Sequence, residues 1–440
     1  MTIFFGYALL IATMSVSLFR PWVGVVGYYL LAIWVPTAIW AWAFSGSRLS
    51  LFVAFSTILG FMLKILLGKI DFSVLRIKQN LYLIILWLCL IISYYFSTIE
   101  VTPTLYNFEN PNYLIKAISK AILFYFVAIL SIDNKRKCHF LVWAMLFSAI
   151  FLIYWGNMEY LQGHMRGLHW TLMGPGYESV VSVYVDENTF AMFYVMTIPY
   201  LYFMGRYYKN KALKWFLWLN IPLAWHCIFL TGSRGGLLGL SIVTLYIVVR
   251  SKSKFLSLAI PALLVLAFVF QSGEVIKRRG LSALDVEQDS SAQHRFDSWE
   301  TGVKMMIDHP VTGVGIGNFM RAYPYYTDKQ PFVAHNTIIQ LGAESGIGAA
   351  LMFLFLCFRI FLAFLKQRNI EALNIDPFLL AVKDSLTGGI AGFFVCSIFL
   401  NLATYELFYY SLVLYAVITR LVNNALKNIN SNKFQTVLTL

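Results

Sequence analysis

Residues 138–155 read CHFLVWAMLFSAIFLIYW, a run of 18 residues without Asp, Glu, Lys or Arg. An α-helix needs about 20 apolar residues to cross the hydrocarbon core of a bilayer. Lys135, Arg136 and Lys137 stand directly before this run, and such basic residues are typical of the cytoplasmic end of a spanning helix. The stretch therefore predicts a transmembrane helix that begins in the cytoplasm.

Similar apolar runs recur along the whole chain and predict an all-α, polytopic integral membrane protein. The chain is 59% hydrophobic and 12% charged, whereas soluble proteins are about 45–50% apolar and about 25% charged. We expect spans at 3–19, 22–44, 50–67, 80–97, 115–131, 138–155, 188–205, 213–231, 235–250, 255–272, 337–362, 384–401 and 405–422. The first run is short, so twelve and thirteen spans fit equally well.

The charges orient these spans. Basic loops near 68–79, 132–138, 206–214, 250–254 and 366–377, and the tail from Arg420 to Lys433, all fall on one side by parity. The positive-inside rule makes that side the cytoplasm. The loops near 98–114, 156–187 and 273–335 then lie on the outer side.

The net charge of +13 arises from short clusters between apolar runs. That distribution favours membrane lipids as partners and argues against nucleic acid. The five cysteines are scattered in or beside apolar runs without CxxC spacing, so we expect buried thiols and neither a disulfide nor a zinc site.

The stretch 273–335 is the one long segment outside the membrane. Phe296, Trp299, Val303 and Met306 recur at helical spacing and predict an amphipathic helix. We expect this helix to end at Asp308-His309-Pro310. Gly313, Gly315 and Gly317 follow and predict a tight turn.

Two arginines on the predicted outer side are candidate site residues. Arg234 lies in Thr231-Gly-Ser-Arg-Gly-Gly236, where an arginine disfavoured by the positive-inside rule is expected to have an anionic partner. The alternative is a turn arginine that reaches lipid phosphate. Arg295 lies on the amphipathic helix, directly before its apolar stripe, and is expected either to face the membrane surface or to be simply solvated.

A second group of candidates surrounds the last re-entry into the membrane. His335, followed by Asn336, could accept a proton near neutral pH or could merely cap the helix. Gln340 and Glu344 lie one turn apart in that helix, as functional groups or as a hydrogen-bonded structural pair. Asp186 and Asn188 open another helix, where acidic residues are favourable in any case.

Some chemistries have no signature in the chain. It contains no P-loop, no HExxH, no Gly-x-Ser-x-Gly and no DxD-like pair with metal spacing. The sequence therefore predicts no metal site, no cofactor and no hydrolysis of ATP.

Four motifs together resemble the O-antigen ligase and polymerase superfamily. They are Thr231-Gly-Ser-Arg-Gly-Gly, His294-Arg-Phe-x-x-Trp299, His309-Pro-Val-Thr-Gly-Val-Gly-Ile-Gly-Asn-Phe319, and His335-Asn-Thr-x-x-Gln-x-x-x-Glu-x-Gly-x-x-Gly348. They occur in the family's order over roughly residues 185–365. Arg20-Pro-Trp-Val-Gly-Val25, Gly174-Pro-Gly176 and Asp186-Glu-Asn188 are similar to the branch with exosortase-associated O-glycosylation ligases, although Glu187 departs from its commoner Asp-Asn-Asn.

The resemblance implies a GT-C-like membrane glycosyltransferase in the bacterial inner membrane. Residues 1–155 would be amino-terminal helices, 156–187 a periplasmic loop, 188–272 helices with the arginine motif, 273–335 a large periplasmic loop with amphipathic helices, and 336–440 the carboxy-terminal helices and cytoplasmic tail. The enzyme would move a glycan from undecaprenyl diphosphate to a sugar hydroxyl of lipid A–core oligosaccharide, working as a monomer on the periplasmic side.

The resemblance also assigns roles to residues. His335, Arg234 and Arg295 would be catalytic, with His335 as general base. Substrate binding would use Arg234, Arg295, Asn336, Gln340, Glu344, Asp186 and Asn188. An O-antigen polymerase, a protein O-oligosaccharyltransferase and, in a different class, a transporter or flippase of lipid-linked sugars remain alternatives.

Overall fold

The computed structural model is almost entirely helical. It describes residues 2–96, 110–165, 170–177, 183–184, 186–251, 254–271, 290–365 and 376–438. No β-strand occurs in these ranges. The predicted outer loop at 98–109, the first part of the long loop at 273–289 and the basic loop at 366–375 lie outside the described residues.

The helices follow the predicted spans closely. In chain order the first are α1 (Thr2–Phe19), α2 (Pro21–Trp34), α3 (Pro36–Ile39), α4 (Ala41–Phe44), α5 (Leu49–Leu66), α6 (Lys78–Tyr95), α7 (Pro111–Ser131) and α8 (Lys135–Leu161). The rest are α9 (Glu187–Tyr207), α10 (Lys211–Thr231), α11 (Arg234–Arg250), α12 (Lys254–Gln271), α14 (Ser290–Asp308), α15 (Phe319–Ala322), α16 (Thr337–Leu365), α18 (Pro377–Ser397) and α19 (Glu406–Leu438).

Seven helices in the described part of the chain are long and apolar enough to cross a membrane. They are α5, α6, α7, α8, α10, the Thr337–Leu362 part of α16, and α18. Shorter apolar helices cover Ile3–Phe19, Pro21–Trp34 and Ala259–Val269. A multi-pass, all-α membrane protein is thereby confirmed, and the total of twelve or thirteen spans stays a prediction.

Several boundaries differ from the sequence prediction, and two of these differences have a clear local cause. The expected span 22–44 is interrupted, because α2 ends at Trp34 and Val35 adopts φ +50° before two four-residue helices. Pro36 explains the break, since proline disfavours helical backbone in the residue before it. The expected span 384–401 begins earlier, at Pro377, where Asp376 accepts a hydrogen bond from the backbone N–H of Phe378 and caps α18.

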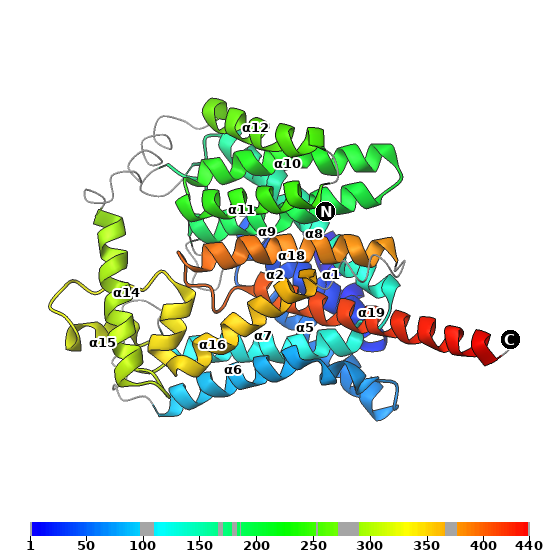
Figure 1. Ribbon diagram of the computed structural model, residues 1–440, viewed down its shortest axis with the longest axis horizontal. Coiled ribbons are helices and arrows are strands. Elements are labelled where there is room, and N and C mark those ends of the chain that lie inside the picture. The colour runs from blue at the N-terminus through cyan, green and yellow to red at the C-terminus, as the bar shows by residue number, and fades with distance from the viewer. Residues whose placement is uncertain are drawn as a thin grey trace.

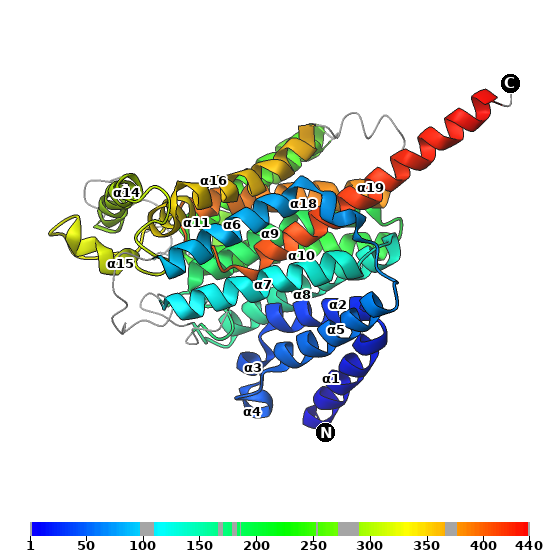
Figure 2. The same cartoon turned by 90° about the horizontal axis from the view of Figure 1, so that it is seen from below.

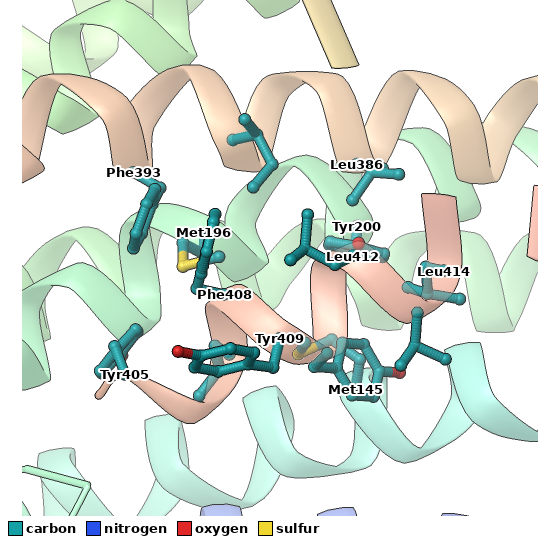
Figure 3. Close-up of a cluster of buried hydrophobic side chains, with 14 of the residues drawn as sticks. Met145, Met196, Tyr200, Leu386, Phe393, Tyr405, Phe408, Tyr409, Leu412 and Leu414 are labelled. Atoms are coloured by element: carbon teal, nitrogen blue, oxygen red, sulfur yellow. The ribbon is translucent and has the colours of Figure 1, made fainter. Parts of the chain in front are cut away.

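Helix α9 lies in the centre of the bundle. All its residues from Thr189 to Gly205 are buried, and it packs against both α10 and α18. A helix enclosed on every side needs no polar face, which accounts for its lack of amphipathic pattern. Figure 3 shows part of the core, where Phe408 and Leu412 of α19 lie among Met196 of α9 and Phe393 of α18.

The bundle has two distinct ends. Helices α14 and α15 lie together at one end, which we call the loop end, and α14 runs across the long helices (Figure 1). The last turns of α19 extend from the opposite end, which we call the tail end (Figures 1 and 2). The long loop and the carboxy-terminal tail, predicted on opposite sides of the membrane, therefore lie at opposite ends.

Contacts between connections agree with this topology. At the loop end, the backbone N–H of Leu172 donates to the carbonyl of Leu230 at 2.9 Å. At the tail end, Lys135 pairs with Asp376. Segments that were predicted to share a side of the membrane thus contact each other.

Candidate active site

Helix α16 is broken about two turns after it begins at Thr337. Ser345 and Gly346 have non-helical backbone angles, with φ +82° and ψ 164° at Gly346. The predicted span 337–362 is therefore two helical pieces, and Glu344 ends the first. A break inside a bundle leaves carbonyls without helical partners, and these must be satisfied elsewhere.

The predicted glycine turn supplies those partners. The N–H of Val314 donates to the carbonyl of Ala343 at 2.8 Å, and the N–H of Gly315 donates to that of Glu344 at 3.0 Å. A Cβ on Gly313, which has φ +62°, would lie 2.3 Å from the backbone carbon of Glu344. Only glycine permits this close approach. The turn therefore fixes the position of the backbone at Glu344 within the bundle.

Replacing Gly346 by Ala should destabilise the protein. Its backbone lies in a region of φ and ψ that is essentially restricted to glycine, and a new Cβ would lie 2.2 Å from the carbonyl oxygen of Val311. Such strain costs about 1–3 kcal/mol, which thermal unfolding of the purified protein in detergent will detect as a lower midpoint.

Gly348→Ala is the matched control. It lies in the same helix, and its added Cβ would meet only the Sγ of Cys89, at 3.3 Å. Equal unfolding midpoints for Gly346→Ala and Gly348→Ala would show that the backbone at the break adapts to an added side chain without strain.

His335 lies directly before α16 in a segment fixed from both sides. Helix α14 holds it through Trp299, whose indole N–H donates to the carbonyl of Ala334 at 2.8 Å. Gln340 accepts from the N–H of Ala334 at 3.0 Å and donates to Glu344 at 2.5 Å. The predicted Gln340–Glu344 pair is thus hydrogen-bonded, and it also orients the residue before His335.

His335 was a candidate cap for this helix, but the cap is made by Asn336 instead. Its side-chain oxygen accepts from the backbone N–H groups of Ile338 and Ile339 at 3.0 and 3.1 Å. This bond satisfies donors at the start of α16, and a role of Asn336 in substrate binding stays a prediction.

The Arg234 motif joins two helices. Gly232 ends α10 with φ +64°, Ser233 caps α11, and Arg234 is the first residue of α11. The Ser233 hydroxyl donates to the side-chain oxygen of Asn188 at 2.7 Å, so Asn188 fixes the motif against α9. Gly236 serves packing, because a Cβ there would lie 2.7 Å from that of Ala191.

The segment 399–402 connects this motif to the histidine. A Cβ on Gly235 would lie 3.5 Å from the Cβ of Phe399, and the Phe399 ring lies 6.5 Å from that of Trp299. Thr337 donates to the carbonyl of Leu400 at 2.7 Å. Gly235, the residue after Arg234, is thus connected through segment 399–402 to Ala334 and Thr337. These two residues flank His335 and Asn336.

The environment of His335 favours a neutral imidazole. Burial is the main cause of its lowered pKa, and the nearby Arg295 guanidinium lowers the pKa further. The Asp186 carboxylate acts in the opposite direction and raises it. Both charges are close enough to act on the ring, so the structure groups three predicted site residues from three distant parts of the chain.

The backbone of His335 is strained as well. Its φ is +46°, a left-handed conformation that is uncommon outside glycine. Strained residues persist only where their surroundings hold them, and they gather at active sites and ligand-binding elements. The bonds made by Ala334 and Asn336 on either side provide that support.

A cavity of about 1870 Å³ opens beside this group. Asp186, His335, Gln340 and Glu344 line it, together with residues of α2, α5 and α7. Pockets for small molecules have volumes of roughly 300–1,000 Å³, so this cavity has room for a larger ligand. Arg234, Arg295, Asn188 and Asn336 are not among its lining residues in the described structure.

Several residues of this region were not expected from the sequence. Trp299 was predicted as part of an apolar stripe and of a family motif but not as a site residue, yet its N–H positions the histidine segment. Of that stripe, Phe296 and Val303 are exposed, whereas Met306 packs toward Gly342 of α16.

Three basic residues also line the cavity, although the sequence patterns assigned them no role: Arg48, Lys116 and Lys120. The positive-inside rule disfavours basic residues on the outer side, so their presence there could have indicated a functional role.

Comparison with known proteins identifies the family of this region. Residues 219–354 match a family model described as O-Antigen ligase. The matched range extends from α10 into α16 and contains Arg234, Arg295 and His335. No curated protein showed a significant match to the chain. The match covers 136 of the 440 residues, and this segment of the chain is similar to the O-Antigen ligase family.

Proposed function

We propose that this protein is an O-antigen ligase. It transfers a glycan from undecaprenyl diphosphate to a sugar hydroxyl of lipid A–core oligosaccharide, without a metal or ATP. One observation carries the proposal: His335, which lies in the segment that matches this family, lines a cavity of about 1870 Å³ with Asp186, and the charge of Arg295 also acts on His335. Such a cavity suits a reaction between two glycolipids.

His335 acts as the general base. A sugar hydroxyl is a weak nucleophile at neutral pH, and removal of its proton by a positioned side chain contributes about 10²–10⁴ in rate. The lowered pKa of His335 keeps the imidazole neutral and able to accept that proton. As the proton moves to the ring, the acceptor oxygen bonds to the anomeric carbon of the donor sugar.

Arg234 and Arg295 act on the leaving group. As the bond from the anomeric carbon to the diphosphate oxygen breaks, negative charge grows on the lipid diphosphate. Guanidinium groups bind such oxygens through two parallel hydrogen bonds and stay charged at every relevant pH. The displacement occurs in one step and inverts the anomeric centre, and His335 then releases its proton to water.

The proposed location is the inner membrane, with the site on the periplasmic side. The positive-inside rule assigns the basic loops to the cytoplasm. Lys135 and Arg136 begin α8 at the tail end, so the loop end with His335 would face the periplasm. The donor diphosphate lies at the surface of the outer leaflet there.

Two assays test this proposal. A ligase-deficient strain that expresses the protein should regain a lipopolysaccharide ladder. The purified protein should transfer glycan from the lipid-linked donor when lipid A–core is offered. Transfer only to a second lipid-linked glycan would instead identify a polymerase, and transfer only to a pilin-like protein would identify a protein O-oligosaccharyltransferase. Movement of donor across vesicles without covalent transfer would identify a transporter.

Replacing Asp186 by Asn should change the pH dependence of the reaction. The Asp186 carboxylate raises the pKa of His335, so its loss lowers that pKa and leaves the imidazole neutral at more acidic pH. We expect the acid limb of kcat/KM to shift to lower pH. Asparagine also caps helices well, so α9 should remain intact.

Asp297→Asn is the matched control, since this carboxylate pairs with Lys329 and is not among the charges that act on His335. Its pH profile should equal that of the wild type. An acid limb that stays in place in Asp186→Asn would argue against His335 as the group that titrates.

A further inference from the structure

Three basic residues outside the family domain line the same cavity. Arg48 lies directly before α5, and Lys116 and Lys120 lie in α7. The two lysines are four residues apart and therefore share one face of the helix. All three side chains are exposed, so they contribute positive charge to the cavity wall formed by α2, α5 and α7.

Both lysines lie in the first half of α7, the half nearer the loop end. With a rise of about 1.5 Å per residue, Lys116 lies roughly 8 Å and Lys120 roughly 14 Å along α7 from Pro111, the residue that begins this helix at the loop end. Ionisable residues within a spanning helix are costly and generally mark functional sites. The positive-inside rule disfavours them at this end of the bundle.

No acidic side chain in the described residues forms a salt bridge with Arg48, Lys116 or Lys120. Glu344, an acidic residue of the cavity, instead bonds to Gln340. The three cations are thus available to an anionic ligand that enters the cavity.

We propose that Arg48, Lys116 and Lys120 form an acceptor anion site, which binds a phosphate group of the acceptor glycolipid. This inference rests on the proposed transferase function and adds a second subsite to it. The donor diphosphate is bonded to the carbon under attack, so it must lie next to His335 and the arginines. Figure 2 shows α5 and α16 far apart at the loop end, with α7 between them.

Cations on the α5–α7 wall therefore suit a phosphate that is separated by several sugars from the reacting hydroxyl. A phosphorylated lipid anchor held there would let the acceptor oligosaccharide extend across the cavity toward His335. Holding a substrate at both ends lowers the entropy cost of orienting its hydroxyl.

The test is a binding experiment that needs no catalysis. Full-length wild type and the triple variant R48Q/K116Q/K120Q are placed in nanodiscs of neutral lipid. Binding of three probes is measured: a diphosphorylated lipid A–core, the same glycolipid after enzymatic removal of its phosphates, and undecaprenyl diphosphate. The control variant K69Q/R76Q/K209Q removes the same charge from exposed residues that do not line this cavity.

We expect the wild type and the control to bind the phosphorylated glycolipid at least about tenfold more tightly than the dephosphorylated one. The triple variant should lose this preference and bind undecaprenyl diphosphate as the wild type does. Equal preference in the triple variant would overturn the acceptor anion site, and loss of undecaprenyl diphosphate binding would assign these cations to the donor.

The results distinguish failure of the anion site from failure of the proposed function. A wild type that binds the phosphorylated glycolipid through these residues but transfers no glycan would retain the anion site and refute the ligase. Transfer activity in the wild type, with unchanged binding by the triple variant, would retain the ligase and refute the anion site.

Discussion

Replacement of His335 by Gln is expected to lower the rate of glycan transfer by about 10²–10⁴-fold, the usual contribution of a general base. Glutamine fills similar space and makes hydrogen bonds, but it cannot accept a proton from the acceptor hydroxyl near neutral pH. Glutamine is not β-branched, so it avoids the strain that Val, Ile or Thr would add at this left-handed position. Single-turnover rates of the purified proteins, at equal protein amounts, provide the measurement.

His294→Gln is the control for this variant. His294 stacks on Phe332 with ring centroids 4.2 Å apart and is not among the residues that line the cavity. Its loss removes an imidazole only a few residues from the site, on the same helix as Arg295. Near-normal transfer by His335→Gln, or a comparable loss in His294→Gln, would contradict the assignment of His335 as the base.

Replacement of Arg295 by Gln is expected to have the second large effect, a loss of about 10²–10³-fold, because preorganised charges at the leaving group are generally the largest catalytic contribution. The variant should also shift the acid limb of the pH profile upward. The Arg295 guanidinium lowers the pKa of His335, so its removal raises that pKa. This direction is opposite to that expected for Asp186→Asn.

Two further variants separate the roles of Arg295. Arg295→Lys keeps the charge but loses the planar fork that binds two phosphate oxygens at once, so it should preserve the pH profile and restore only part of the rate. Lys304→Gln removes another exposed cation from α14 and should have little effect. A rate loss in Arg295→Gln without any shift in pH profile would show that Arg295 does not act on His335.

The spans were predictable because hydropathy integrates over about 20 residues and tolerates local errors. The breaks were not, since each depends on one or two residues within an apolar run. Val35 leaves the helix because Pro36 follows it. Gly346 breaks α16 because a turn more than thirty positions earlier supplies hydrogen bonds to the freed carbonyls. A periodicity analysis does not register either cause.

The motifs allowed candidate site residues to be proposed one by one, because they carry unusual polar groups at membrane boundaries, and the roles of these residues stay predictions. Their mutual arrangement was not. The effect of Asp186 on His335 joins residues about 150 positions apart, and no local pattern encodes it. The lysines of α7 appeared as ordinary charges of a helix until the cavity grouped them with Arg48.

An experimental structure with bound undecaprenyl diphosphate tests the central claim most directly. The account predicts the diphosphate at the loop end, with its oxygens within hydrogen-bond distance of the Arg234 and Arg295 guanidiniums, and the His335 imidazole facing the space where an acceptor hydroxyl would approach the anomeric carbon. A diphosphate bound at the tail end, or one contacted by neither arginine, would contradict it.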